Sequence, residues 1–191
     1  MSAGHLFVSP HLDDAVFACG EWIVSSPSSI VVTIFAGAPP AGAALTSWDA
    51  ECGFRDGDAT QTIADTLASV IARAPSSAIH FPLGLFHRDH VRASDACVML
   101  VDRLDAYELY VYEDALYRRI IGAVDERMNA LREHGLDLAR CAPALARDAQ
   151  SRKREAVACY RSQLRGLRTH EAYDDIDAPE AHWGVRSRSR R

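Results

Sequence analysis

Histidine and aspartate residues gather in two short segments of this sequence, and both types can bind a metal or move a proton. The first segment, residues 9–14, reads SPHLDD and contains His11, Asp13 and Asp14. One histidine and two carboxylates this close together suit a divalent metal ion with a general base beside it. The segment is therefore the first half of a candidate metal site.

The second segment, residues 87–90, reads HRDH. His87 and His90 are three residues apart at the start of a predicted helix, so they can share one face of it. His11, Asp14 and one histidine of this pair would make a set of two imidazoles and one carboxylate. Three protein ligands with a position left for water are typical of catalytic zinc sites.

Each segment directly follows an apolar stretch that predicts a buried strand, at residues 6–9 and 78–81. If both strands belong to one parallel sheet, both segments emerge at the same carboxyl edge, where α/β proteins bind their ligands. We therefore expect the two segments to meet.

Each segment also has a simpler interpretation when taken alone. Asp13 and Asp14 suit the positive end of a helix dipole at a helix N-terminus. His87 and His90 suit a solvated or capping pair at a helix start. The two simpler interpretations would have to coincide by accident, so the metal site is favoured.

The rest of the chain alternates between strand and helix patterns. We expect strands at 6–9, 30–35, 78–81 and 107–112, helices at 14–25, 57–73, 91–104, 120–134 and 148–167, and an irregular segment or short edge strand at 137–146. Residues 30–35 are almost uniformly apolar and β-branched, the pattern of a strand buried on both faces. Strand, helix, strand in this order predicts a parallel βαβ unit and an α/β fold, a Rossmann-like three-layer αβα sandwich with a mostly parallel sheet.

Length and composition point to one domain over residues 1–191. The chain has 191 residues, 48% of them hydrophobic, and a formal net charge of -5, which argues against a nucleic-acid partner. The basic end, residues 185–191, predicts a flexible tail. No apolar stretch is long enough to span a bilayer, and there is no signal-peptide pattern at the start. The five cysteines form no CxxC pair, so we expect a reducing, cytoplasmic location. The sequence leaves a homo-oligomer open.

Three motifs together resemble the PIG-L/LmbE superfamily of zinc-dependent N-acetylglucosaminyl deacetylases. Residues 10–14 match its Pro-His-x-Asp-Asp run, and residues 87–90 match its His-x-Asp-His run. A later stretch, residues 153–163, matches a Lys…Ala…Tyr-x-Ser-Gln pattern common in the family. The resemblance spans from Leu6 to about Leu167, which is most of the chain.

The resemblance implies a function and assigns roles. It implies removal of an N-acetyl group from an amino sugar or glycoconjugate, with a zinc-activated water attacking the amide carbonyl and Fe²⁺ or Co²⁺ as alternative metals. The implied roles are: metal ligands His11, Asp14 and His90; general base Asp13; stabilisation of the acetyl oxygen, His87; and orientation of a histidine, Asp89.

The sequence departs from the family pattern at two places that bear on the substrate. Some relatives carry a tyrosine two residues before the first histidine of the second motif, as a helper for the oxyanion, and this chain has Leu85 there. The interval 48–79 is short compared with that of many relatives. Candidate substrate contacts are Asp49, Arg55 and Glu113, which follow predicted strands.

Two other functions are weighed against the deacetylase. A catalytically silent carbohydrate-binding protein on the same fold would fit the absence of a tyrosine at Leu85. Carboxylate-bound Mg²⁺ with phosphoryl chemistry is disfavoured, because two histidine ligands do not suit a metal that prefers oxygen.

Overall fold

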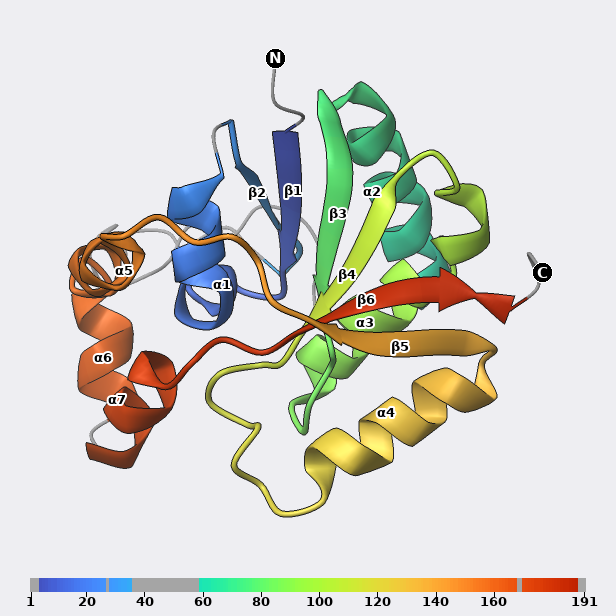
Figure 1. Ribbon diagram of the computed structural model, residues 1–191. Coiled ribbons are helices and arrows are strands. Elements are labelled where there is room, and N and C mark those ends of the chain that lie inside the picture. Colours follow the sequence, from blue (N-terminus) through green and yellow to red (C-terminus); the bar gives the residue numbers. More distant parts are fainter. Residues whose placement is uncertain (1–3, 27, 36–58, 168–169, 189–191) are drawn as a thin grey trace, which may run out of the picture.

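The computed structural model describes residues 4–26, 28–35, 59–167 and 170–188. In this part of the chain a six-stranded sheet has the order β2-β1-β3-β4-β6-β5 (Figure 1). Its strands are β1 (Gly4–Ser9), β2 (Ile30–Thr33), β3 (Ser76–Pro82), β4 (Glu108–Tyr112), β5 (Leu136–Cys141) and β6 (His182–Ser187). The first four strands in that order are parallel to one another, and β6 is antiparallel to both β4 and β5.

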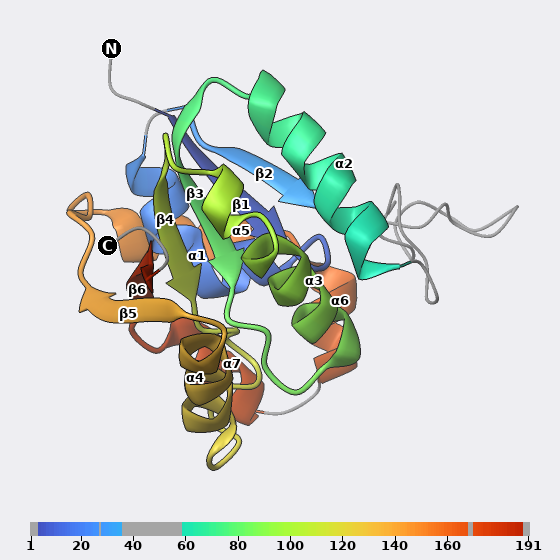
Figure 2. The ribbon, with the colours of Figure 1, turned by 90° about the vertical axis from the view of Figure 1, so that its right-hand side faces the viewer.

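Helices cover both faces of this sheet (Figures 1 and 2). They are α1 (Asp14–Ser25), α2 (Thr60–Arg73), α3 (Arg88–Val98), α4 (Ala123–Glu133), α5 (Ala149–Val157), α6 (Arg161–Leu167) and α7 (His170–Asp177), with a 3₁₀ turn at Val101–Arg103. α2 and α3 lie on one side of the sheet and α1 and α5 on the other. The predicted three-layer α/β architecture is confirmed.

The apolar residues of β1 show why the sheet needs cover on both faces. Successive residues of a strand point to opposite faces. Leu6 and Val8 pack in one core with residues of α2 and α3, whereas Phe7 packs in a second core with residues of α1. Leu6, Phe7 and Val8 are all fully buried.

Two expectations about strands are wrong. Residues 30–35 were expected to form a strand buried on both faces, but β2 is an edge strand and Val31 is 39% exposed. Apolar composition reflects packing against helices and does not reveal whether a strand has a neighbour on each side. The predicted basic tail begins too early, because residues 185–187 form the end of β6, where Val185 pairs with Leu109 and Leu138. The basic residues there mask an alternation in which Val185 is buried and Arg186 is exposed.

The C-terminal part also differs from expectation in its helices. The single helix expected at 148–167 is divided into α5 and α6, and α7 was not predicted.

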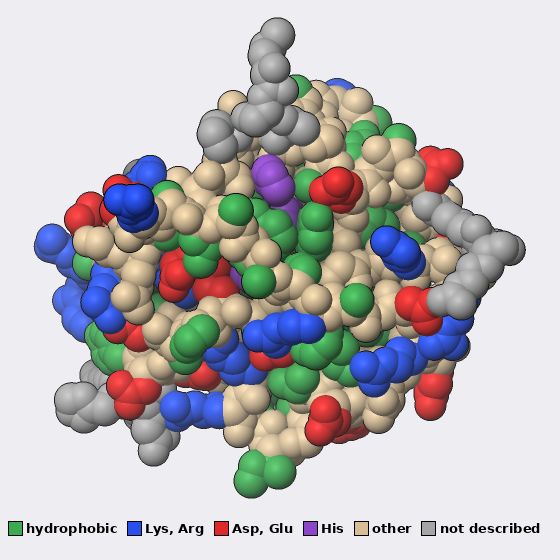
Figure 3. All heavy atoms as spheres, in the orientation of Figure 1, with side chains coloured by type: hydrophobic (Ala, Val, Ile, Leu, Met, Phe, Trp, Pro, Cys, Tyr) green, Lys and Arg blue, Asp and Glu red, His purple; other side chains and the backbone are tan. Residues whose placement is uncertain are grey.

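No helix within the described ranges is long and apolar enough to cross a membrane. On the face shown in Figure 3, acidic and basic side chains are interspersed.

Candidate metal centre

Both predicted segments lie at the carboxyl edge of the sheet, after neighbouring parallel strands. Residues 9–14 connect β1 to α1, and residues 87–90 open α3 shortly after β3. β1 lies between β2 and β3, so the chain goes to one side of β1 for β2 and to the other side for β3. Such a reversal of strand order creates the crevice in which α/β proteins bind ligands.

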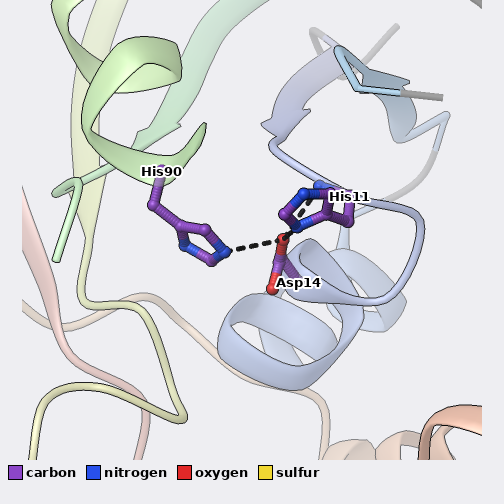
Figure 4. Close-up of side chains that lie close together, drawn as sticks. All are labelled: His11, Asp14 and His90. Atoms are coloured by element: carbon purple, nitrogen blue, oxygen red, sulfur yellow. Dashed lines mark hydrogen bonds and ion pairs between the residues drawn. The ribbon is translucent and has the colours of Figure 1, made fainter. Parts of the chain in front are cut away.

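His11, Asp14 and His90 converge at this point (Figure 4). Asp14 Oδ2 lies 3.1 Å from His11 Nδ1 and 3.2 Å from His90 Nε2. One candidate ligand atom from each residue lies within 4.8 Å of the others. The side chains of His90 and Asp14 are only 2% and 11% exposed, whereas that of His11 is 27% exposed. The cluster is therefore open to ligands from the His11 side.

Local hydrogen bonds hold the first segment in shape. The backbone N–H of His11 donates to Asp14 Oδ2 at 2.8 Å. The Ser9 hydroxyl donates to the His11 carbonyl and accepts from the backbone N–H of Ala15 at 3.0 Å. These bonds close the strand-to-helix turn, so His11 and Asp14 face the same side.

Asp114, which like Glu113 follows a predicted strand and was expected at most to contact a polar ligand, supports the cluster instead. It is buried just after β4, and its Oδ1 lies 2.5 Å from His90 Nδ1. Its Oδ2 accepts hydrogen bonds from the backbone N–H groups of Gly84 and Leu85, at 2.9 and 3.0 Å. A carboxylate on Nδ1 orients the imidazole and leaves Nε2 toward Asp14, as second-sphere partners of metal-bound histidines do. The sequence signal for this role was that Asp114 closely follows the predicted strand at 107–112, as the two cluster segments follow theirs.

Asp89 lies on the opposite side of His11. Its Oδ2 is 3.2 Å from His11 Nε2, and its Oδ1 is 3.7 Å from Arg92 Nη1. His11, His87 and Asp89 form a second group whose candidate ligand atoms lie within 4.8 Å of one another. Asp89 is thus placed to orient His11, although its role stays a prediction.

His87 caps α3 and also faces the cluster. Its ring accepts a hydrogen bond from the backbone N–H of Asp89 at 3.3 Å, so the simpler capping interpretation holds for this histidine. Its ring centroid is 5.5 Å from that of His11 and 5.6 Å from that of His90. Burial, with repulsion from His90 and His11, lowers the pKa of His87. The lowered pKa favours the neutral ring, in which Nδ1 accepts the bond from Asp89 and Nε2 carries the hydrogen.

Charge coupling within the cluster is strong. Burial opposes protonation of His90, but Asp14 and Asp114 outweigh it and raise the pKa of His90 to about 10. Burial would likewise raise the pKa of Asp14, but His90 and His11 hold it below its usual range. The carboxylates of the cluster thus favour a positive charge there. Two imidazole nitrogens and one carboxylate oxygen suit zinc better than Mg²⁺, which prefers oxygen ligands. The donor set therefore fits a zinc ion.

Asp13 and Tyr117 border the cluster. Asp13 is half-buried at the N-cap of α1, where its side chain makes no capping hydrogen bond. Tyr117 is half-buried, and burial together with Asp14 and three further carboxylates, those of Asp114, Asp13 and Asp89, raises the pKa of its phenol to about 12. Tyr117 thus places a tyrosine beside the cluster. Leu85, at the position where some relatives have a tyrosine, is 1% exposed and packs in the core.

Of the three predicted substrate contacts only Glu113 lies within the described residues, and its bonds lead away from the cluster. Asp49 and Arg55 lie outside the described residues. Glu113 bonds elsewhere, accepting from Trp183 Nε1 at 3.1 Å and from Arg140 Nη1 at 3.4 Å. Its carboxylate joins the end of β4 to β5 and β6, so it does not reach into the cluster.

The third motif has a structural role in the described contacts. Lys153 is 2% exposed, and its Nζ lies 3.0 Å from Glu180 Oε1. The Tyr160 hydroxyl donates to the backbone carbonyl of Leu12 at 3.1 Å. The motif thus anchors α5 and the following turn against the core, and Tyr160 also supports the loop that carries His11.

Comparison with known proteins identifies the fold. No family model matches the sequence, and no curated protein matches it. Among solved structures, the chain is similar to a zinc-inhibited form of the teicoplanin deacetylase Orf2, with a TM-score of 0.71 and 17% identity over 96% of this chain and 98% of that one. It is also similar to the A40926 pseudoaglycone deacetylase Dbv21, with a TM-score of 0.70 and 22% identity over 96% of this chain and 97% of that one. A deacetylase–teicoplanin complex aligns with a TM-score of 0.68 and 17% identity over 96% of this chain and 98% of that one. At these identities the similarity establishes the fold of this chain.

Proposed function

We propose that this protein is a metal-dependent N-deacetylase of the PIG-L/LmbE type, which removes the acetyl group from an amino sugar or glycoconjugate. The proposal rests on the arrangement of His11, Asp14 and His90. Both histidine rings lie within 3.2 Å of Asp14 Oδ2, and Asp13 belongs to the same turn as Asp14. The similar solved structures are named as deacetylases, which supports the same reaction.

The metal proposed for this site is zinc, with Fe²⁺ or Co²⁺ as alternatives, held by His11, Asp14 and His90. Its contribution when bound is to polarise the amide carbonyl and to lower the pKa of a coordinated water to about 7. Asp114 keeps His90 Nε2 directed toward the ligand position by its bond to Nδ1. For Asp89 we propose that its contact with His11 Nε2 orients that ring and keeps Nδ1 toward Asp14.

The chain itself moves the protons. Asp13 takes a proton from the attacking water as the oxygen–carbon bond forms, and the carbonyl pair moves onto the acetyl oxygen. We assign stabilisation of that oxygen to His87, whose ring centroid is 5.5 Å from that of His11. When the carbon–nitrogen bond breaks, Asp13 returns the proton to the leaving amine, and the products are acetate and the free amino sugar.

We further propose that the enzyme works in the cytoplasm on a small N-acetylated molecule. The scattered cysteines support a reducing compartment, and the described ones, among them buried Cys19 and Cys97, form no disulfide with each other.

The proposal is tested by measuring amine release from a panel of N-acetylated sugars with the wild type and Asp13→Asn. We expect Asp13→Asn to lose about 10²- to 10⁴-fold in kcat while keeping its bound zinc, because it removes the base and not a ligand. Metal content is measured by mass spectrometry, and Asp125→Asn, on the exposed first turn of α4, serves as the control. Sugar binding without turnover by zinc-loaded wild type would contradict the proposal and favour the silent carbohydrate-binding protein.

A further inference from the structure

Phe86 follows Leu85, which is buried in the core, and is itself 73% exposed. It immediately precedes His87, and its φ is 55°. Positive φ is a genuine outlier for a bulky residue, because the side chain crowds the backbone there. An exposed aromatic ring on a left-handed backbone next to a candidate site requires an explanation.

The backbone around Phe86 forms a tight turn. The N–H of His87 donates to the carbonyl of Leu85 at 2.6 Å, across Phe86. A three-residue turn with positive φ at its centre is the rare and strained form of the γ-turn. Such strain persists only where the surroundings impose it, and it concentrates at ligand sites.

The surroundings do impose this turn. Asp114 accepts hydrogen bonds from the N–H groups of both Gly84 and Leu85. Gly84 has φ 84°, and a Cβ there would lie 2.6 Å from Ser94 Cβ, so the chain packs directly on α3. On the other side, His87 caps the same helix. The direction of the Phe86 side chain is therefore fixed by both neighbours.

Phe86 is connected to the cluster by a series of ring contacts. Its ring centroid is 5.8 Å from that of Tyr117. The Tyr117 ring meets the His90 ring edge-on at 5.0 Å and lies nearly parallel to the His87 ring, at 18° and 6.3 Å. Tyr117 is half-buried beside His90, the candidate metal ligand, and the exposed Phe86 extends the aromatic surface into solvent.

We propose that Phe86 and Tyr117 form an aromatic subsite that binds an apolar aglycone carried by the acetylated sugar. The inference rests on the proposed deacetylase function and narrows its substrate class to amphiphilic glycosides. The subsite runs from the cluster outward, as an aglycone does when the acetamide group occupies the cluster. Burying the exposed Phe86 ring against an apolar group is favourable.

The test compares phenyl and methyl glycosides of N-acetylglucosamine by amine release. We expect wild type to prefer the phenyl glycoside in kcat/KM by roughly tenfold, as is common for an added apolar group in a binding pocket. Phe86→Ala and Phe86→Gly should both reduce this ratio to about one, and Phe86→Leu should keep part of it. Met99→Ala, an exposed apolar residue at the far end of α3, should keep the wild-type ratio.

A parallel calorimetric titration separates this inference from the proposed function. It measures binding of both glycosides to zinc-loaded Asp13→Asn protein with and without Phe86→Ala. If neither glycoside is hydrolysed but phenyl binds more tightly and Phe86→Ala removes the difference, the deacetylase proposal fails and the subsite stands. If both glycosides are hydrolysed with equal kcat/KM, and Phe86→Ala changes neither the ratio nor binding, the subsite is overturned and the deacetylase stands.

Discussion

Two adjacent aspartates of this protein differ in their surroundings, and the difference separates their proposed roles. Asp14 lies between His11 and His90, with its Oδ2 within 3.2 Å of both rings. Asp13 occupies the N-cap of α1, and its carboxylate makes no capping bond. A carboxylate shared by two imidazoles is suited to hold a metal, whereas for its neighbour on the same turn we propose the exchange of a proton.

At the residue scale, the sharpest prediction concerns Asp114. Asp114→Asn replaces the carboxylate that holds His90 Nδ1 and two backbone N–H groups. We expect zinc affinity to fall about 10- to 100-fold, because the imidazole loses its orienting partner. The measurement is a competition titration against a chelator of known affinity.

Glu113→Gln is the matched control for this experiment. Glu113 is the neighbouring carboxylate, but it bonds to Trp183 and Arg140 and not to the cluster. Its substitution should leave zinc affinity at the wild-type value. Equal affinities for Asp114→Asn and wild type would show that His90 does not depend on Asp114.

At the scale of elements, the site depends on the junction between β3 and α3. Ser94 of α3 donates to the carbonyl of Leu83 at 3.0 Å, and Gly84 allows the two to approach. The same junction carries Phe86, and then His87 and His90 at the start of α3. Close packing here therefore sets the positions of the second half of the cluster.

Gly84→Ala tests that junction. Its φ of 84° disfavours any side chain, and the new Cβ would lie 2.6 Å from Ser94 Cβ. We expect a loss of about 2 to 4 kcal/mol in the free energy of unfolding, from backbone strain and overpacking together. Urea denaturation gives the value.

Gly122→Ala isolates the backbone part of that effect. Gly122 has φ 83°, but no atom lies within 4 Å of a Cβ built there. Its loss should be about 1 to 2 kcal/mol, from strain alone. A loss at Gly84 no larger than that at Gly122 would mean that close packing against Ser94 contributes nothing.

At the scale of the whole molecule, the second core contains a histidine held neutral. His80 is fully buried, with its ring stacked 4.1 Å from that of Phe7 and 4.9 Å from that of Tyr110. Burial, and then repulsion from His5 and His182, lowers its pKa well below 6.5. In the window below about pH 6.5 the unfolded chain binds a proton at this position that the folded protein excludes. Stability from this group is therefore complete above that pH and decreases as the pH falls.

We expect the free energy of unfolding to fall by up to about 1.4 kcal/mol per pH unit through His80 between about pH 6.5 and 5.5. His80→Phe removes the titrating group, so its profile should be flatter than that of the wild type by the equivalent of one proton. Denaturant unfolding of both proteins in metal-free buffer at several pH values provides the comparison. Parallel profiles would contradict a neutral His80.

Local sequence patterns determined a large part of this architecture. Residues 14–25 carry a helix whose bounds agree with α1, because apolar spacing and the turn after it are both local signals. The parallel order of β1, β2 and β3 also followed from alternation of strand and helix, and it brought His11 and His90 to one edge. Alternation did not reveal that β2 lies at the edge of the sheet or that residues 182–187 form a strand between two others.

The sequence by itself thus determined the fold class and the two segments that meet, because residue type and spacing encode periodicity and ligand chemistry. Only the tertiary structure showed that Asp114 holds His90 and that Phe86 stands exposed beside the cluster. It also showed that Glu113 bonds away from the cluster, although Glu113 and Asp114 are neighbours after the same strand. These facts depend on which side chains from distant parts of the chain come within bonding distance, and the spacing of residues along the sequence does not contain that information.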